Sequence, residues 1–168
     1  MEKNKPVIFL AFANDRDDTV RYLRNLPAEL RQIREVLESA KSAGVCNVVE
    51  RANATAKDIL DVFQHPDYRN RIAIFHYGGH ANGYQLLLES PEGKTQLADT
   101  GGLAEFLAQQ NGLQLVFLNG CSTQQQVQGL QKAGIPSIIA TSQDIDDAVA
   151  TTFATSKNPV AWILDNLQ

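Results

Sequence analysis

Short runs of consecutive apolar residues recur along the chain and mark buried strands. Each run contains few polar positions, which is typical of strands that are covered on both faces. Between the runs, apolar residues instead return at intervals of three and four, as one face of a helix requires. The predicted core strands are residues 7–12, 45–49, 72–77, 115–118 and 135–140.

The helices are predicted from this spacing together with start and stop signals. Pro27 suits the beginning of a helix, and Gly44 suits its end. Thr55 and Asp58 resemble a capping box at the start of a second helix, which His65-Pro66 ends. Further helices are predicted from Asp99 or Thr100 to about residue 111, up to Leu130, and from about Asp146.

The alternation of strands and helices indicates an α/β protein. We expect a mostly parallel sheet with helices on both faces, a three-layer α/β/α sandwich. Residues 84–88 and the turn at 91–94 add a short hairpin at the edge of the domain. The length of 168 residues suits one domain, and we find neither internal repeats nor a linker. Residues 1–168 are therefore interpreted as a single domain.

Composition and charge exclude several classes of protein. The chain is 43% hydrophobic and 20% charged, which is unlike a disordered chain or a coiled coil. Its 15 basic and 19 acidic residues give a net charge of −4, so we expect no nucleic-acid partner. No apolar run approaches the roughly 18 residues that span a bilayer, and the polar start resembles no signal peptide.

Two cysteines are too few for a disulfide framework or a four-sulfur metal site. A reducing, cytoplasmic setting is the simplest interpretation. In that setting each cysteine is either part of the core or part of the chemistry. We expect no metal ion and no cofactor.

The candidate chemistry lies where two predicted strands end. Gly78-Gly79-His80 follows the strand at 72–77, and Asn119-Gly120-Cys121 follows the strand at 115–118. In an open α/β sheet, ligands bind beyond the carboxyl ends of the strands. If these two strands are neighbours, His80 and Cys121 emerge at the same edge, although they are 41 residues apart in the sequence.

This pairing would suit nucleophilic catalysis. A free thiol with a pKa of about 8.5 is only slightly ionised at neutral pH, and an adjacent imidazole can activate it. The same imidazole can then protonate a leaving amine. Backbone N–H groups of Cys121 and of Ala81, directly after His80, are candidates for an oxyanion hole.

Each candidate also has a purely structural interpretation. Cysteine is among the most buried residue types, so Cys121 could be structural. Cys46 lies within a predicted strand and is interpreted as core. His76 also lies within a strand, where a packed or hydrogen-bonded role is favoured over catalysis.

These motifs resemble the CHAT family of caspase-like cysteine peptidases. The resemblance covers roughly residues 5–154 and implies a caspase–haemoglobinase fold. It implies His80 as the catalytic histidine, rather than His76, and Cys121 as the nucleophile. The residues that carry it are IFHYGGH at 74–80 and LNGCST at 118–123, flanked by YQLLL at 84–88 and GIPSIIATS at 134–142.

The resemblance also suggests how a substrate side chain would be bound. Residues 145–147 match a region that helps to shape the P1 pocket, where an acid could receive Arg or Lys. Asp147 is the first candidate and Asp146 the second, although acids near a helix start are also favoured by the helix dipole. The chain departs from the family in having Ala81 where glycine is usual, and it is expected to be short at its C-terminus.

The leading hypothesis is an endopeptidase that cleaves a protein or peptide after a basic residue, in bacterial signalling or defence. We expect a regulatory protein or self-association to control it, and no membrane partner. The alternative is a non-catalytic scaffold, which would tolerate loss of His80 or Cys121. A small-molecule binder would use the strand-end glycines, but no Gly-x-Gly-x-x-Gly or P-loop occurs. The acidic loop at residues 14–18 could bind a divalent ion, but adjacent acids in a solvated loop are the ordinary case.

Overall fold

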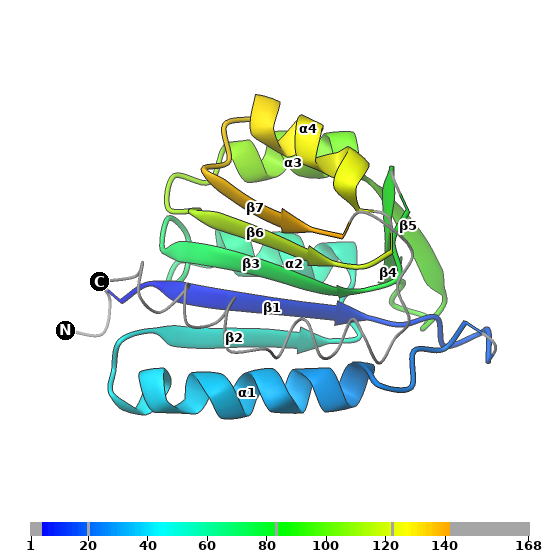
Figure 1. The fold of residues 1–168 in the computed structure, drawn as a ribbon, viewed down its shortest axis with the longest axis horizontal. Helices are drawn as coiled ribbons and strands as arrows, with labels where there is room; N and C mark the ends of the chain where they lie inside the picture. The colour runs from blue at the N-terminus through cyan, green and yellow to red at the C-terminus, as the bar shows by residue number, and fades with distance from the viewer. Residues whose placement is uncertain (1–4, 20, 83, 122, 142–168) are drawn as a thin grey trace.

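The centre of the protein is one five-stranded parallel sheet. The computed structural model describes residues 5–19, 21–82, 84–121 and 123–141. The strand order across the sheet is β2-β1-β3-β6-β7, so β3 is the middle strand and lies directly beside β6 (Figure 1). The strands are β1 (Val7–Ala13), β2 (Asn47–Ala52), β3 (Ile72–Gly79), β6 (Leu115–Asn119) and β7 (Ser137–Ala140).

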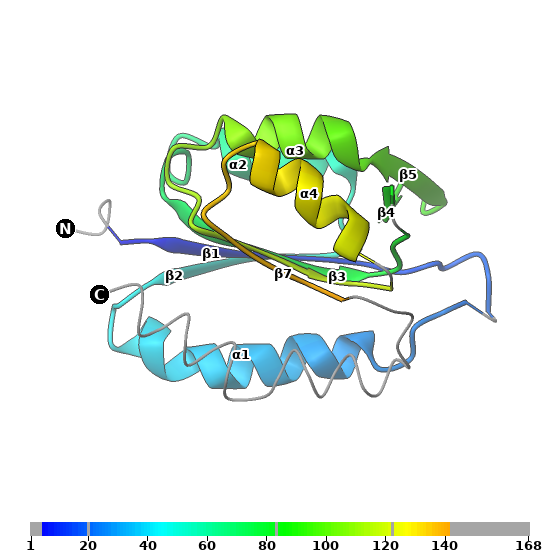
Figure 2. The same cartoon turned by 45° about the horizontal axis from the view of Figure 1, so that its top comes forward.

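Helices cover both faces of this sheet, as Figure 2 shows. One face carries α1 (Leu26–Ser42), and the other carries α2 (Ala56–Gln64), α3 (Thr100–Ala108) and α4 (Gln124–Lys132). The predicted α/β class with a three-layer arrangement and a parallel sheet is confirmed.

Alternating side chains along the strands build two separate cores. Phe9 and Phe75 point to the side of α2, α3 and α4, where they pack with Phe63. Ile8 and Ile74 point to the opposite side and pack against the apolar stripe of α1. Because side chains alternate along a strand, an unbroken apolar run supplies both cores at once. The stripe of α1 consists of Leu26, Leu30, Ile33, Leu37 and Ala40.

A separate antiparallel hairpin, β4 (Gln85–Glu89) and β5 (Thr95–Asp99), lies beyond the carboxyl ends of the central strands (Figure 1). Single bridges join it to the main body, from Leu86 to Ala81 and from Glu89 to Thr55. The predicted hairpin is therefore confirmed, and it lies at the edge where the candidate chemistry was expected.

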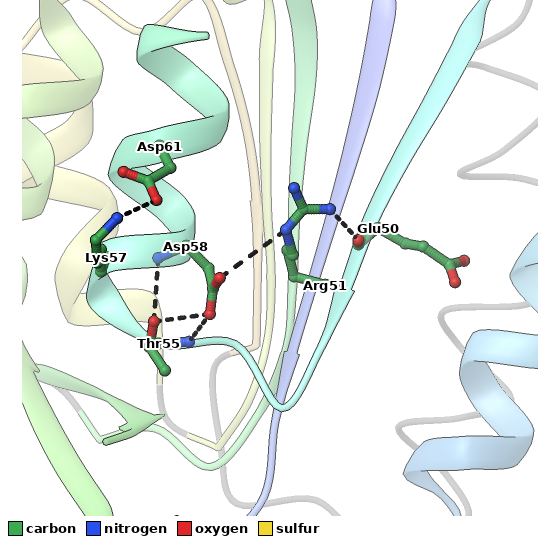
Figure 3. Close-up of polar contacts among 6 residues, drawn as sticks. All are labelled: Glu50, Arg51, Thr55, Lys57, Asp58 and Asp61. Atoms are coloured by element: carbon green, nitrogen blue, oxygen red, sulfur yellow. Dashed lines mark hydrogen bonds and ion pairs between the residues drawn. The ribbon is translucent and has the colours of Figure 1, made fainter. Parts of the chain in front are cut away.

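The start of α2 is held by a complete capping box (Figure 3). The Thr55 hydroxyl accepts a hydrogen bond from Asp58 N at 3.0 Å, and the Asp58 carboxylate accepts one from Thr55 N at 2.9 Å. Burial alone would raise the pKa of Asp58. The hydrogen bonds from Thr55 and the nearby Arg51 and Lys57 outweigh it and hold that pKa below its ordinary value.

Several local predictions differ from the structure: β7 begins at Ser137 rather than at residue 135, and α3 ends at Ala108 rather than near residue 111. The second strand begins at Asn47 and extends to Ala52, whereas residues 45–49 were predicted. The strand is at the edge of the sheet and carries polar residues, so its far end lacks an apolar signal. The acidic loop is not wholly solvated either, because Asp15 is buried. The helix predicted from about Asp146 lies outside the described residues.

Candidate active site

The order of the strands brings the two predicted catalytic residues to the same edge. In the register of β3 and β6, Gly78 is the partner of Asn119. His80 follows two residues after Gly78, and Cys121 follows two residues after Asn119. Both side chains are partly exposed. The sequence left open whether the two strands are neighbours, and in the structure β3 and β6 are adjacent.

The segments that carry these two residues are in direct contact. A Cβ atom built on Gly120 would lie 2.7 Å from the Gly79 carbonyl oxygen and 2.8 Å from the Ala81 Cβ. No room for a side chain exists between the residues that flank His80 and the residue before Cys121. The absence of a side chain at Gly120 is therefore what allows the two strand ends to approach.

A main-chain carbonyl holds the imidazole of His80. Its Nε2 atom is hydrogen-bonded to the carbonyl oxygen of Arg21, in the loop between β1 and α1. Because a carbonyl oxygen can only accept, Nε2 carries the proton in this arrangement. In the neutral ring, Nδ1 is then left as the acceptor, which is the form that a general base needs. The sequence offered no third member for the pair, since the group is a backbone atom.

The loop that supplies this carbonyl is closed by Asn14. The Asn14 side chain accepts a hydrogen bond from Leu23 N at 2.8 Å and donates one to Leu23 O at 2.9 Å. It also accepts from Asp15 N at 3.0 Å. Asn14 is buried, so these bonds form away from solvent and are correspondingly strong. Asn14 directly follows β1, so these bonds fix the segment that contains Arg21 to the end of that strand.

Tyr77 fixes the main chain of His80 from below. Its hydroxyl lies 2.7 Å from the carbonyl oxygen of His80 and 2.6 Å from that of Leu87, and it can donate to either. The side chain is fully buried, and burial raises the pKa of the phenol well above its ordinary value. The hydroxyl thus stays protonated and remains a donor.

The turn at Cys121 is pinned from the other side by two threonines. Thr141, after β7, donates from its hydroxyl to the carbonyl oxygen of Gly120. The Thr141 N–H donates a hydrogen bond to the Thr123 hydroxyl at 2.9 Å. The Thr123 hydroxyl in turn lies 3.2 Å from the carbonyl oxygen of Leu118, to which it can donate. Both flanks of Cys121 are therefore tied to the sheet.

Ala81, whose N–H is a predicted oxyanion-hole donor, occupies the position where glycine is usual in the family. Its φ is not positive, because Asn53 and Asn70 are the only non-glycine residues with a positive φ in the described part of the chain.

Buried acid lies beside this edge, at a position that sequence reasoning did not assign to the site. Asp15 accepts a hydrogen bond from the Thr95 hydroxyl at 3.0 Å and pairs with the Arg21 guanidinium at 3.5 Å. Its side chain is 6% exposed, whereas that of Arg21 is 56% exposed. The acidic loop was visible in the sequence, but nothing in it distinguished a buried acid from a solvated one. Asp146 and Asp147, the predicted pocket acids, lie outside the described residues.

Cys46 and His76, interpreted from the sequence as structural residues, both lie in the core. Cys46 is buried in the α1 core, and burial raises the pKa of its thiol. His76 is buried between the rings of Phe12 and Phe117. Across the described ranges, no three His, Cys, Asp or Glu side chains cluster as a metal ion would need. Nor does any helix in those ranges have the length and apolar character to cross a membrane.

Comparison with solved structures identifies the class of fold. The crystal structure of the Drosophila initiator caspase Dronc superposes with a TM-score of 0.51 at 12% sequence identity, covering 73% of this chain. The match covers 51% of the Dronc chain, so this chain spans about half the length of that structure. At this identity the similarity concerns the fold alone, which is a caspase-like α/β fold.

The family follows from the sequence itself. The CHAT domain profile matches residues 2–156, almost the whole chain, and the protein belongs to the CHAT domain family. A search of curated proteins found no match. The resemblance to caspase-like CHAT peptidases that the two motifs indicated is confirmed.

Proposed function

We propose that this protein is a cysteine endopeptidase in which His80 and Cys121 form the catalytic pair. The observation that carries the proposal is the contact of Gly120 with Gly79 and Ala81, which holds the two strand ends together. The bond from His80 to the Arg21 carbonyl supports it, because it favours the tautomer that can accept a proton.

In the proposed reaction, Nδ1 of His80 takes the thiol proton of Cys121, and the sulfur attacks the carbonyl carbon of the substrate. The peptide oxygen becomes an oxyanion, which the N–H groups of Ala81 and Cys121 would stabilise. Collapse of this intermediate breaks the C–N bond, and His80 gives its proton to the leaving amine. Water then hydrolyses the thioester, which frees the acid product and the thiol.

We further propose a preference for Arg or Lys at the position before the cleaved bond. Arg21 itself supports a preference for a basic side chain. Its carbonyl oxygen is hydrogen-bonded to His80, and its guanidinium forms an ion pair with Asp15. One arginine residue therefore spans the space between His80 and Asp15, so their separation is no more than the reach of an extended arginine. A substrate arginine that displaced the exposed Arg21 side chain would gain a charge-assisted bond with a buried carboxylate. Asp147 and Asp146 remain proposed contributors to the same pocket.

The proposed setting is the bacterial cytoplasm, in signalling or defence, with a protein or peptide as substrate and a regulatory protein or self-association as control. Family resemblance and the presence of only two cysteines, neither in a disulfide, support this setting. The alternative function is a non-catalytic scaffold of the same fold, which would need neither His80 nor Cys121.

The test is covalent labelling with a peptide probe that carries arginine and a thiol-reactive ketone, followed by mass spectrometry. We expect an adduct on Cys121 that disappears in His80→Ala, while Cys46→Ala labels normally. Asp15→Asn should lower labelling by the arginine probe at least tenfold and spare an apolar probe. Labelling of Cys121 no faster than a free thiol, by any probe, would favour the scaffold.

A further inference from the structure

A buried carboxylate lies directly beneath the candidate active site. Glu29, in the first turn of α1, is 1% exposed. Its Oε1 atom accepts a hydrogen bond from Asn119 Nδ2 at 2.9 Å. The same atom is 3.4 Å from His76 Nε2, which is within ion-pair distance but without hydrogen-bond geometry. A Cβ atom on Gly78 would lie 3.1 Å from it.

These contacts converge on the residues that precede the catalytic pair. Gly78 is two residues before His80, and Asn119 is two residues before Cys121. Gly78 and Asn119 are also register partners across β3 and β6. One oxygen atom of Glu29 is therefore hydrogen-bonded to β6 at Asn119 and lies beside β3 next to His76 and Gly78, just before each chain turns toward the active site.

Glu29 also fixes the segment that carries Arg21. The loop that contains Arg21 is tied at its start, where Asn14 binds Leu23. It leads into α1, whose first turn is tied to the sheet by Glu29. The carbonyl that holds His80 is therefore anchored on one side by the end of β1 and on the other by Glu29.

Stability alone does not explain a carboxylate at this place. Burying an ion costs several kcal/mol of desolvation, which its partners offset only when the geometry is good, and apolar replacement of buried ion pairs is often neutral or stabilising. The contact with His76 lacks hydrogen-bond geometry and leaves His76 Nε2 without a hydrogen-bond partner among the described residues. Apolar residues of matching shape at both Glu29 and Asn119 would therefore suit the core at least as well.

We propose that Glu29 is a positioning residue that sets His80 and Cys121 relative to one another. It acts on the strands through its hydrogen bond to Asn119 of β6 and its place beside His76 and Gly78 of β3, and through α1 on the Arg21 carbonyl. It touches neither substrate nor the reacting atoms. Its importance for catalysis rests on the proposed peptidase function, whereas its effect on the arrangement of His80 does not.

The experiment compares wild type with Glu29→Leu, Glu29→Gln and the control Glu35→Gln, which removes an exposed carboxylate of the same helix. The tautomer of His80 is measured by ¹⁵N NMR of the imidazoles. The chain has three histidines, and His80→Ala assigns the signal. Thermal unfolding and the rate of Cys121 alkylation by iodoacetamide are measured on the same samples.

We expect Glu29→Leu to fold but to unfold at a lower temperature than wild type, because the buried Asn119 Nδ2 loses the acceptor that Glu29 provides, and to lose the Nε2–H signature of His80. Alkylation of Cys121 should fall at least tenfold. Glu29→Gln retains an oxygen that can accept from Asn119, so it should recover part of both signals. Glu35→Gln should match wild type throughout.

A folded Glu29→Leu protein with the wild-type His80 spectrum overturns the proposal. If Glu29→Leu does not fold, Asn119→Leu removes the same hydrogen bond from the other side, and its His80 spectrum decides in the same way. A wild-type Cys121 that is no more reactive than a free thiol defeats the peptidase function instead. The His80 spectra then still decide whether Glu29 positions the ring.

Discussion

Gly120 faces the carbonyl oxygen of Gly79 so closely that a Cβ atom would lie 2.7 Å from that oxygen. The obstructing atom is backbone, so it cannot move aside as a flexible side chain would. Gly120→Ala should therefore push the segment of Cys121 away from that of His80. We expect a loss of about 1–3 kcal/mol in the free energy of unfolding, as for other overpacked sites, and a large fall in Cys121 alkylation.

Gly102→Ala is the matched control for this variant. A Cβ atom there meets nothing within 4 Å, and the residue lies within α3. Alanine should stabilise the helix by up to about 1 kcal/mol and leave Cys121 alkylation unchanged. Urea denaturation measures the free energy of unfolding of Gly120→Ala and Gly102→Ala, and the rate of Cys121 alkylation is measured on the same two variants. Equal behaviour of the two alanines would contradict the tight contact at Gly120.

The two cysteines should differ sharply in their reaction with iodoacetamide. Burial raises the pKa of the Cys46 thiol, so its reactive thiolate forms only at higher pH than for an ordinary cysteine. Cys121 is partly exposed. At pH 7.5 in native protein, mass spectrometry should find the adduct on Cys121 well before Cys46. Denaturation in urea should remove the difference, and preferential modification of native Cys46 would refute its burial.

Removing the hydroxyl of Tyr77 should disturb the main chain at His80. Tyr77→Phe leaves the Leu87 carbonyl without its donor and the His80 carbonyl with only the Leu87 N–H, at 3.0 Å. The expected loss is about 1–2 kcal/mol in the free energy of unfolding, measured by urea denaturation. Tyr84→Phe is the control, because Tyr84 is 72% exposed. If both variants lost the same stability, the buried hydroxyl would have no special role.

The capping box of α2 should make stability depend on pH at the acidic end. The pKa of Asp58 is lowered in the folded protein, so its contribution is complete above the unfolded pKa of about 4. It is lost as the pH falls through the lower, folded value. Asp58→Asn should therefore be less stable than wild type at pH 7, and the gap should narrow toward pH 3. A gap that stays constant on acidification would contradict the assignment.

Thr55→Ala removes the other half of the box and should cost about 0.5–2 kcal/mol at pH 7. The mutated side chain is part-buried, and its hydroxyl accepts from Asp58 N (Figure 3). Thermal unfolding at pH 7 measures the loss. Thr55→Ser is the control, because serine keeps an accepting hydroxyl and should retain most of the stability.

The central fold could be predicted because burial and sequence pattern agree there. All of β1 and β3 is buried, so the apolar run of β1 is unbroken and that of β3 is interrupted only by His76. The stripe of α1 follows a regular spacing because only one face of that helix meets the sheet. The edge strand β2 was misplaced by two to three residues, since Glu50 and Arg51 at its far end carry no apolar signal.

The candidate site was only partly predictable for a different reason. His80 and Cys121 were found because strand ends and glycines mark them in the sequence. Arg21 enters through its carbonyl oxygen, an atom that every residue possesses, and Asp15 is distinguished from Asp17 and Asp18 only by burial. Glu29 resembles any first-turn acid of a helix until its contacts with β3 and β6 are known.

The use of a backbone carbonyl to hold His80 has a consequence for how this loop can vary. Exchange of the Arg21 side chain for another leaves that carbonyl in the chain, so residue identity at this position is a poor guide to whether the imidazole is oriented. The number of residues between Asn14 and Leu23, whose hydrogen bonds close the loop, does affect the position of that carbonyl. Insertion or deletion of a single residue there would carry the oxygen away from the ring, so the orientation of the imidazole depends on the length of this loop and on Asn14 rather than on the side chain at position 21.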